Sequence, residues 1–271
     1  MTGIDKEAME AGRLITSFQY DSLGFVKTFF GVTPDEWQAE ALCALDAGED
    51  VAVRSGHGVG KTALLAWMCI KTLACFPYAK VPCTAPTQHQ LRDLLWAEIA
   101  YWLNRSPLQS LMKWTATGLS MAGYEESWFA AARTANRSEN LAGFHAPKLL
   151  YLIDEASGID DPIFETIEGA MTTQGAQLVM AGNPTRISGY FFDAFHKARR
   201  RWHCMHVSSE SCSRVTSDYP KRMAEKWGKD TDIYRVRVLG DFPSGDSTAF
   251  INLSIVEDAV SRWHDAPLSG V

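Results

Sequence analysis

The sequence predicts an α/β fold in which a mostly parallel sheet carries helices on both faces. Segments with helical periodicity alternate along the chain with short apolar runs of strand length. The run Leu149–Ile153 is apolar without interruption, as expected of a central strand that is buried on both sides. A glycine-rich turn joins the apolar run at 51–53 directly to a helical segment. Together these features are typical of a doubly covered parallel sheet.

Local patterns place the individual elements. Helices are predicted near residues 34–46, 61–75, 87–103, 189–200, 217–227 and 231–239. Strands are predicted near residues 51–54, 80–84, 128–133, 148–153, 177–181 and 203–208. The last of these strands contains "WHCMHVS", whose alternation puts His203 and Cys204 on opposite faces and argues against a metal site there.

Composition limits the class of protein. The 271 residues are 46% hydrophobic, which is enough for one large α/β domain or a domain with a small appendage. The sequence has no apolar run of about eighteen residues and no signal-peptide pattern, so we expect a soluble, cytosolic protein without a membrane partner. Six scattered cysteines without a C-x-x-C pair indicate reduced thiols.

Charge gives a weaker indication of partners. The formal net charge of -6 argues against a surface that is basic throughout. The stretch "HKARRRWH" at 196–203 is the strongest local basic patch, and it could contact a nucleic-acid backbone. A solvated helix end with cations near its C-terminus explains the same residues.

The glycine-rich turn "SGHGVGKT" predicts a phosphate site. Free N–H groups at a helix N-terminus attract anions, and glycines let the backbone approach a phosphate closely. Lys61 can reach the terminal phosphates and the Thr62 hydroxyl can bind Mg²⁺, which is the P-loop arrangement. Ser55 stands where that motif has its first glycine. The predicted nucleotide-binding residues of this loop are Ser55, Gly56, His57, Gly58, Val59, Gly60, Lys61 and Thr62.

An acid pair supplies the second half of a reaction centre. The apolar run in "KLLYLIDEAS" ends in Asp154 and Glu155, and ligands of parallel sheets bind at the carboxyl ends of the strands. We expect Asp154 to hold Mg²⁺ together with Thr62, and Glu155 to polarise the water that attacks the γ-phosphate of ATP. The alternative is a helix cap and first turn, where acids are also favoured.

The helix near 34–46 has a predicted start. Thr33 and Glu36 have the spacing of a capping box, and Pro34 would occupy the first helical position. This start places Trp37 and Gln38 shortly before the phosphate loop. The Gln38 amide can pair with the edge of adenine or bond within the protein, and Trp37 is expected to pack in the core.

Polar residues also follow the apolar run at 177–181. In "AGNPT", Asn183 and Thr185 could hydrogen-bond the γ-phosphate or the attacking water and report hydrolysis. An Asx turn before Pro184 is the structural alternative.

These stretches resemble the ATPase domain of the large terminase subunit, the motor that packages DNA into the capsids of tailed phages. The resemblance rests on the order of "PDEWQ", "SGHGVGKT", "GFHAPKLLYLIDEAS", "AGNPT" and "YRVRVLGDFPSG". It implies a P-loop NTPase sheet of ASCE type, ATP and Mg²⁺ as cofactors, and Glu155 as the catalytic carboxylate. It also implies Gln38 near adenine, and Asn183 and Thr185 in coupling.

The resemblance implies partners as well. They are double-stranded DNA, the portal protein and the small terminase subunit, in a homo-oligomeric ring on the portal in the host cell cytoplasm, with a monomer as the alternative in isolation. In such a ring, each subunit would insert an arginine finger into the ATP site of its neighbour. The stretch "ARTANRSENLAG" offers Arg133 and Arg137 for this role. Either residue could instead be an ordinary surface arginine. Many terminases have an arginine where this loop has His57, so the positive charge near the phosphates must come from another residue or be absent. Arg54 is close to the loop in sequence, at the end of the preceding strand.

The expected division is an ATPase core at 1–205, a small helical lid at 206–250 and a connector at 251–271 toward a nuclease domain. We expect no nuclease activity from this chain, because Glu257, Asp258 and Asp265 are too loosely spaced for a two-metal site. Two other functions fit the same motifs: a helicase-like DNA-dependent ATPase, although no second repeat of the loop and acid pair is found, and an ATP-controlled docking module with slow turnover.

Overall fold

An eight-stranded sheet forms the centre of the protein. The computed structural model describes residues 3–245 and residue 260, and the strand order in the sheet is β3-β4-β5-β2-β6-β7-β1-β8. The six strands from β5 to β8 in this order run parallel, and β3 and β4 are antiparallel to their neighbours. The bounds are β1 Val51–Ser55, β2 Lys80–Thr84, β3 Met112–Trp114, β4 Gly118–Met121, β5 Phe129–Ala132, β6 Leu150–Ile153, β7 Gln177–Gly182 and β8 His203–Val207.

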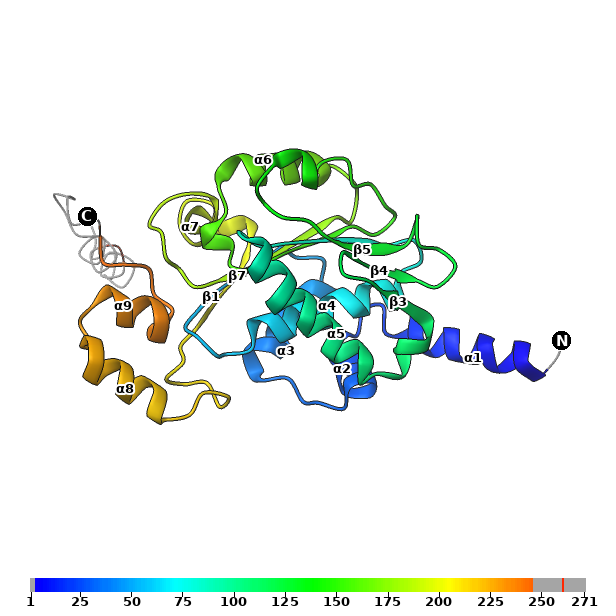
Figure 1. Cartoon of the computed structure of the whole chain (residues 1–271), viewed down its shortest axis with the longest axis horizontal. Coiled ribbons are helices and arrows are strands. Elements are labelled where there is room, and N and C mark those ends of the chain that lie inside the picture. Colours follow the sequence, from blue (N-terminus) through cyan, green and yellow to red (C-terminus); the bar gives the residue numbers. More distant parts are fainter. Residues whose placement is uncertain (1–2, 246–259, 261–271) are drawn as a thin grey trace, which may run out of the picture.

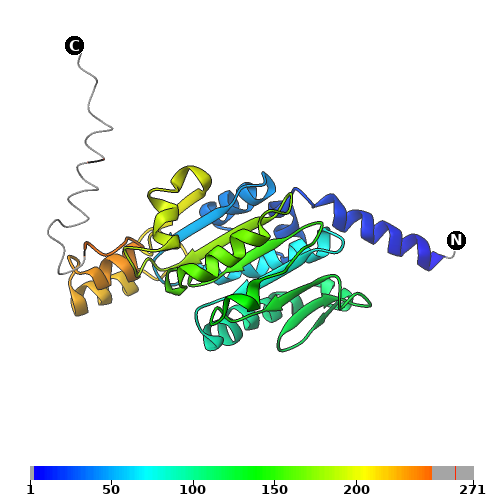
Figure 2. The same ribbon diagram turned by 90° about the horizontal axis from the view of Figure 1, so that it is seen from above.

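Helices cover both faces of this sheet (Figure 1). The longer ones are α1 Gly3–Ser17, α2 Ser22–Phe30, α3 Glu36–Asp46, α4 Lys61–Cys75, α5 Ala97–Asn104, α6 Asp161–Ala170 and α8 Asp218–Trp227. The shorter ones are α7 Tyr190–Phe195 and α9 Asp232–Tyr234, with π-helical turns at Gln90–Trp96 and Arg235–Leu239. Helices α2 to α5 pack on one face, and α6 and α7 on the other. Figure 2 shows α1 extending from one end of the molecule and α8 and α9 at the opposite end.

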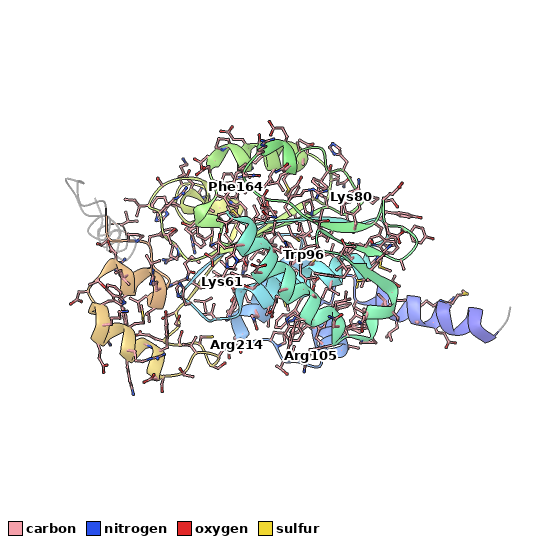
Figure 3. The ribbon with its side chains drawn as sticks, in the orientation of Figure 1. Lys61, Lys80, Trp96, Arg105, Phe164 and Arg214 are labelled. Carbon is pink, nitrogen blue, oxygen red and sulfur yellow. The ribbon has the colours of Figure 1, made fainter. Side chains whose placement is uncertain are left out.

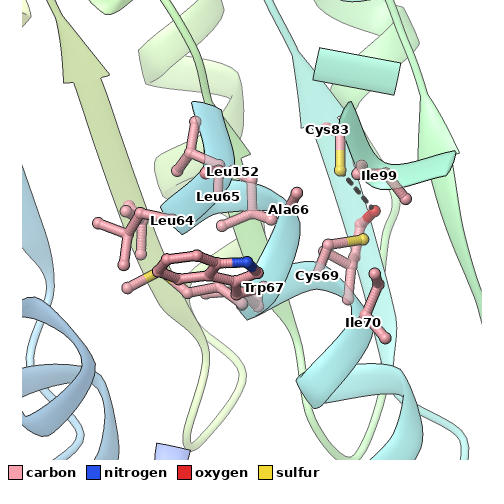
Figure 4. Close-up of a cluster of buried hydrophobic side chains, with 14 of the residues drawn as sticks. Leu64, Leu65, Ala66, Trp67, Cys69, Ile70, Cys83, Ile99 and Leu152 are labelled. Atoms are coloured by element: carbon pink, nitrogen blue, oxygen red, sulfur yellow. Dashed lines mark hydrogen bonds between the residues drawn. The ribbon is translucent and has the colours of Figure 1, made fainter. Parts of the chain in front are cut away.

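The alternation of side chains along each strand divides the core into two layers. Leu150 and Leu152 of β6 point into the layer with α4, whereas Tyr151 and Ile153 point into the layer with α6. Helix α4 is buried at every position except Thr62, and Trp67 near its centre belongs to the same buried cluster as Leu152 of β6 (Figure 4). The helix that follows the phosphate loop is therefore fixed by packing over its whole length.

All twelve predicted helices and strands are present near their expected positions. The predicted helix near 189–200 is shorter than expected, because α7 ends at Phe195 and a separate 3₁₀ turn forms at Arg199–Arg201. Helices α1, α2 and α6 and the strands β3 and β4 were not predicted. Strand β3 has only three residues, which are too few for the alternation of Met112, Lys113 and Trp114 to identify a strand.

The sheet brings the ends of three strands together. Register pairs Val53 of β1 with Ala181 of β7, and Ile153 of β6 with Met180 of β7. Ser55, Asp154 and Asn183, which end or follow these strands, consequently lie at the same edge of the sheet. No helix within the described ranges is long and apolar enough to cross a membrane. Glu257, Asp258 and Asp265 of the predicted connector lie outside the described residues.

Candidate nucleotide-binding site

The loop between β1 and α4 has the geometry of a phosphate loop. Gly58 and Gly60 have positive φ angles of 77° and 97°, and Gly60 is the N-cap of α4. The Lys61 side chain is almost buried, and its Nζ donates to Ser55 Oγ at 3.0 Å and to the Gly56 carbonyl at 3.3 Å. Ser55 thus replaces the motif glycine with a hydroxyl that holds the lysine in place. Burial lowers the pKa of Lys61, and the charges of Glu155 and Asp154 oppose this effect.

The acid pair faces this loop from the end of β6. Asp154 is 3% exposed, and its Oδ2 accepts a hydrogen bond from Thr62 Oγ1 at 3.4 Å. Burial, and then the charge of Glu155, raise the pKa of Asp154 to about 6. A carboxylate and a hydroxyl oxygen at this place are suitable donors for Mg²⁺, whose charge would favour the ionised form of Asp154.

Glu155 has an unusual backbone conformation. Its φ of 50° and ψ of 43° are left-handed, and within the described chain only Tyr78 is another non-glycine residue with positive φ. A non-glycine residue in this region costs about 1–3 kcal/mol and is found most often at functional sites. The Glu155 carboxylate lines the cavity in front of the loop, and its Oε2 lies 3.5 Å from the Asn183 backbone nitrogen.

Asn183 connects the end of β7 to the loop. Its side chain is buried, and Nδ2 donates to the Ser55 carbonyl at 2.6 Å. Asn183 also lines the cavity in front of the loop. Thr185 is exposed and is not among the residues that line this cavity; its hydroxyl and backbone nitrogen are both 3.0 Å from Ser157 Oγ. The structure therefore brings Asn183, but not Thr185, to the cavity.

Gln38 is buried behind the loop. Its Nε2 donates to the Gly60 carbonyl at 3.1 Å, and its Oε1 accepts from the Asp35 backbone nitrogen at 3.0 Å. The predicted capping box of Thr33 and Glu36 is wrong, because α3 begins at Glu36, with Asp35 as N-cap and Gln38 as its capping-box partner. The amide of Gln38 is engaged within the protein, and its contact with adenine stays a prediction.

The segment 235–241 supports the loop from behind. The His57 backbone nitrogen donates to the Arg237 carbonyl at 2.8 Å, and Ser209 Oγ donates to the His57 carbonyl at 2.7 Å. Gly240 packs directly against the loop, since a Cβ at this position would lie 2.6 Å from the backbone of Ser55 and Gly56. These contacts explain the position of the "VRVLGD" stretch in the fold.

A cavity of about 790 Å³ opens in front of the loop. It is large enough for a nucleotide, since small-ligand sites usually measure about 300–1,000 Å³. Figure 3 labels two of its basic residues, Lys61 and Arg214. The lining residues are His57, Gly58, Val59, Gly60, Lys61, Thr62, Ala63, Glu98, Tyr101, Trp102, Glu155, Asn183 and Arg214.

The chain is similar to phage terminase proteins. The chain is 30% identical over 266 residues to the probable large terminase subunit of Enterobacteria phage P7. The match covers 92% of this chain and 54% of that protein, so the chain spans about half the length of this relative. The chain is related to the large terminase subunits. No family model matches it.

Solved terminase structures have the same fold. The large terminase of bacteriophage HK97 superposes with a TM-score of 0.65 at 18% identity, over 88% of this chain and 58% of that one. The ATPase domain of the Thermus phage P74-26 large terminase gives 0.60 at 15% identity, over 79% of this chain and 95% of that one. The large terminase of a thermophilic bacteriophage, in complex with ADP, gives 0.58 at 12% identity, over 83% of this chain and 53% of that one. The predicted fold, a P-loop NTPase sheet of ASCE type as in the terminase ATPase domain, is confirmed.

Three arginines were considered from the sequence for a role at the phosphates, and none of them lines the cavity in front of the phosphate loop. Arg54 is paired with Asp241 at 2.9 Å, and its guanidinium lies over the rings of Phe195 and Phe242. Arg133 follows β5 and is exposed, as is Arg137, which precedes a 3₁₀ turn. Both exposed side chains are free to face a neighbouring molecule, and the role of a finger stays a prediction for each.

Two other basic features considered from the sequence add no positive charge to the cavity at pH 7. His57 lines the cavity, but partial burial and then the charge of Lys61 lower its pKa to about 4, so it is neutral at pH 7. Arg199–Arg201 precede β8 and therefore lie at the amino ends of the parallel strands, away from the loop. Within the described part of the chain, no cluster of three histidine, cysteine or acidic residues is arranged to bind a metal.

Five residues that line the cavity were not predicted from the sequence: Ala63, Glu98, Tyr101, Trp102 and Arg214. Arg214 lies in the loop between β8 and α8 and lines the cavity beside Gly60. It stands alone in "SCSRVTS", and its approach to the loop depends on contacts across more than 150 positions of sequence, so no local signal identifies it.

Proposed function

We propose that this chain is the ATP-hydrolysing motor domain of a phage large terminase subunit and powers translocation of double-stranded DNA into a procapsid. One observation carries the proposal: Asp154 and Glu155 at the end of β6 lie opposite Lys61 and Thr62, with 3.4 Å between Thr62 Oγ1 and Asp154 Oδ2. Both halves of a phosphoryl-transfer centre therefore meet at one cavity.

Each residue has a defined task in this proposal. The backbone N–H groups of the loop cradle the phosphates, and Lys61 neutralises the β and γ phosphates. Thr62 and Asp154 would hold Mg²⁺, which would supply positive charge that neutralises the phosphates. Glu155 orients the attacking water by accepting a hydrogen bond from it.

Hydrolysis can be reported to the sheet through Asn183. Its backbone nitrogen lies near Glu155, while its side-chain amide donates to the Ser55 carbonyl at the start of the loop. If Glu155 moved after phosphate release, Asn183 would therefore transmit this movement to both β1 and β7. This connection supports a coupling role for Asn183.

The proposed partners are double-stranded DNA, the portal protein and the small terminase subunit. In a homo-oligomeric ring, Arg133 or Arg137 would reach the site of a neighbour, which agrees with their exposure in this chain. The predicted lid of residues 206–250 stays a proposal: Arg214 of this region lines the cavity, residues 206 and 207 belong to β8, and residues 246–250 lie outside the described residues.

The test compares ATP turnover of the wild type and of Glu155→Gln with and without DNA and portal. We expect wild-type specific activity to rise with protein concentration and with these partners, and Glu155→Gln to bind ATP but turn over at least about a hundredfold more slowly. A Glu155→Gln protein with wild-type turnover would refute the assignment of the water-orienting residue. Turnover that ignores DNA, portal and concentration would refute the motor.

A further inference from the structure

Arg214 is held against the phosphate loop by two neighbours from the start of α3. Its Nε donates to Asp35 Oδ2 at 2.5 Å, and its Nη2 donates to Gln38 Oε1 at 3.2 Å. Gln38 in turn donates to the Gly60 carbonyl, so guanidinium, amide and loop form one connected network. The stem of Arg214 also contacts the loop, since its Cδ is 3.3 Å from the place where a Cβ on Gly60 would lie.

The position of this guanidinium is suited to an anion in the cavity. It is the one arginine among the described residues that line the cavity, and its side chain is 35% exposed. An arginine has five N–H donors in a planar fork. Asp35 and Gln38 use two of them, and Nη1 has no hydrogen bond within the described chain.

Few other cationic side chains could supply positive charge at the cavity. His57 is neutral at pH 7 and Arg54 is paired with Asp241 behind the loop, so Lys61 is the only other charged base at the cavity within the described residues. Glu155 and Asp154 add negative charge at the same site. Arg214 would therefore add a second cationic side chain, beside Lys61, for the phosphates of a nucleotide.

We propose that Arg214 binds the polyphosphate of the nucleotide held by its own P-loop, with Asp35 and Gln38 as the residues that position it. This inference rests on the proposed nucleotide site. A guanidinium that is already held in place loses little conformational freedom when a phosphate arrives, and it can offer two donors to phosphate oxygens. Arg214 thereby supplies in cis the positive charge that His57 does not.

A purely structural role for Arg214 gives different expectations. If the arginine only ties its loop to α3, its removal lowers stability and leaves the ionic part of nucleotide binding unchanged. Direct contact with phosphates makes part of the affinity depend on salt, because screening weakens attraction between accessible charges. The salt dependence of nucleotide affinity therefore separates the two roles.

The experiment titrates ATP and ADP calorimetrically into the wild type, Arg214→Ala, Arg214→Lys, Asp35→Asn and Arg222→Ala at low and high ionic strength, with melting temperatures recorded. Arg222 is the matched control, because it is an ion-paired arginine of the neighbouring helix α8 that does not line the cavity. We expect Arg214→Ala to weaken ATP and ADP binding about 10- to 100-fold and to reduce the salt dependence. Arg214→Lys should keep most of the salt dependence, Asp35→Asn should lose less affinity than Arg214→Ala, and Arg222→Ala should match the wild type.

The result that overturns the inference is a folded Arg214→Ala protein with wild-type affinity and salt dependence, whatever its melting temperature. The inference would also be overturned if Asp35→Asn and Arg214→Ala lost the same nucleotide affinity and both kept the wild-type salt dependence. That result would show that Arg214 only ties its loop to α3. Lys61→Ala distinguishes failure of the site itself. If Lys61→Ala binds ATP normally, the proposed nucleotide site is wrong; if it binds weakly while Arg214→Ala is unaffected, only the role of Arg214 is wrong.

Discussion

Replacing Gly240 by alanine tests how the phosphate loop is held. Gly240 has φ 74° and ψ 24°, a left-handed conformation that costs an alanine about 1–2 kcal/mol. The added Cβ would lie 2.6 Å from the backbone of Ser55 and Gly56, so the loop or the segment 235–241 must also shift. Overpacking of this kind costs typically about 1–3 kcal/mol. We therefore expect Gly240→Ala to lower the free energy of unfolding by about 2–5 kcal/mol and to weaken ATP binding.

Gly31 provides the control for backbone strain. It caps α2 with φ 66° and ψ 25°, nearly the conformation of Gly240, but nothing lies within 4 Å of a Cβ added there. Gly31→Ala should therefore cost only the strain of about 1–2 kcal/mol and leave ATP affinity unchanged. Urea unfolding and calorimetric ATP titration of both variants give the comparison. Equal destabilisation by the two substitutions, with normal ATP affinity in both, would refute the view that Gly240 holds the loop.

Three further outcomes follow from the site. Lys61→Ala should weaken ATP binding at least about tenfold, since a buried charge next to the phosphates is lost; unchanged calorimetric affinity would contradict this. In an assembled ring, Arg133→Ala should hydrolyse ATP about a thousandfold more slowly than the wild type. If the arginine acts in trans, mixing Arg133→Ala with Glu155→Gln should restore activity. No recovery of activity in mixed rings, with assembly confirmed by scattering, would exclude Arg133. The pKa of Asp154 is about 6 in the folded protein, above its usual 3.8. Between these two pH values the unfolded chain has already released the proton that the folded protein still binds. The free energy of unfolding therefore falls as the pH rises from 3.8 to about 6, by at most ~3 kcal/mol. Asp154→Asn should lack this fall in urea titrations without nucleotide or Mg²⁺, and a wild-type pH dependence in the variant would show that other groups cause it.

The parts of the site that could be predicted from the sequence are those with a local signature. The loop from Gly56 to Lys61 is contiguous, and Asp154 and Glu155 directly follow a fully apolar strand. The rule that parallel strands present their carboxyl ends at one edge then predicts that loop and acids meet. The distance between Thr62 and Asp154 confirms that prediction of geometry.

The parts that could not be predicted depend on contacts between distant segments. Gly240 looks like an ordinary turn residue in the sequence, and only the packed structure shows it against Gly56. Thr33 and Asp35 both have the side-chain chemistry of an N-cap, so composition alone could not choose between them. Gln38, the capping-box partner of Asp35, also donates to the Gly60 carbonyl, which is a contact between segments that no local pattern predicts.

The hydrogen bond from His57 to the Arg237 carbonyl has a mechanical consequence. Beyond Arg237, the backbone turns at Gly240 against Gly56 and continues into the C-terminal part of the chain. A tension applied to the chain after Gly240 would load the Arg54–Asp241 ion pair together with this bond and this glycine contact. The force would thus reach the phosphate loop through packed contacts on both β1 and the loop itself, so the strain on the loop and the pull on the segment 235–241 would rise and fall together.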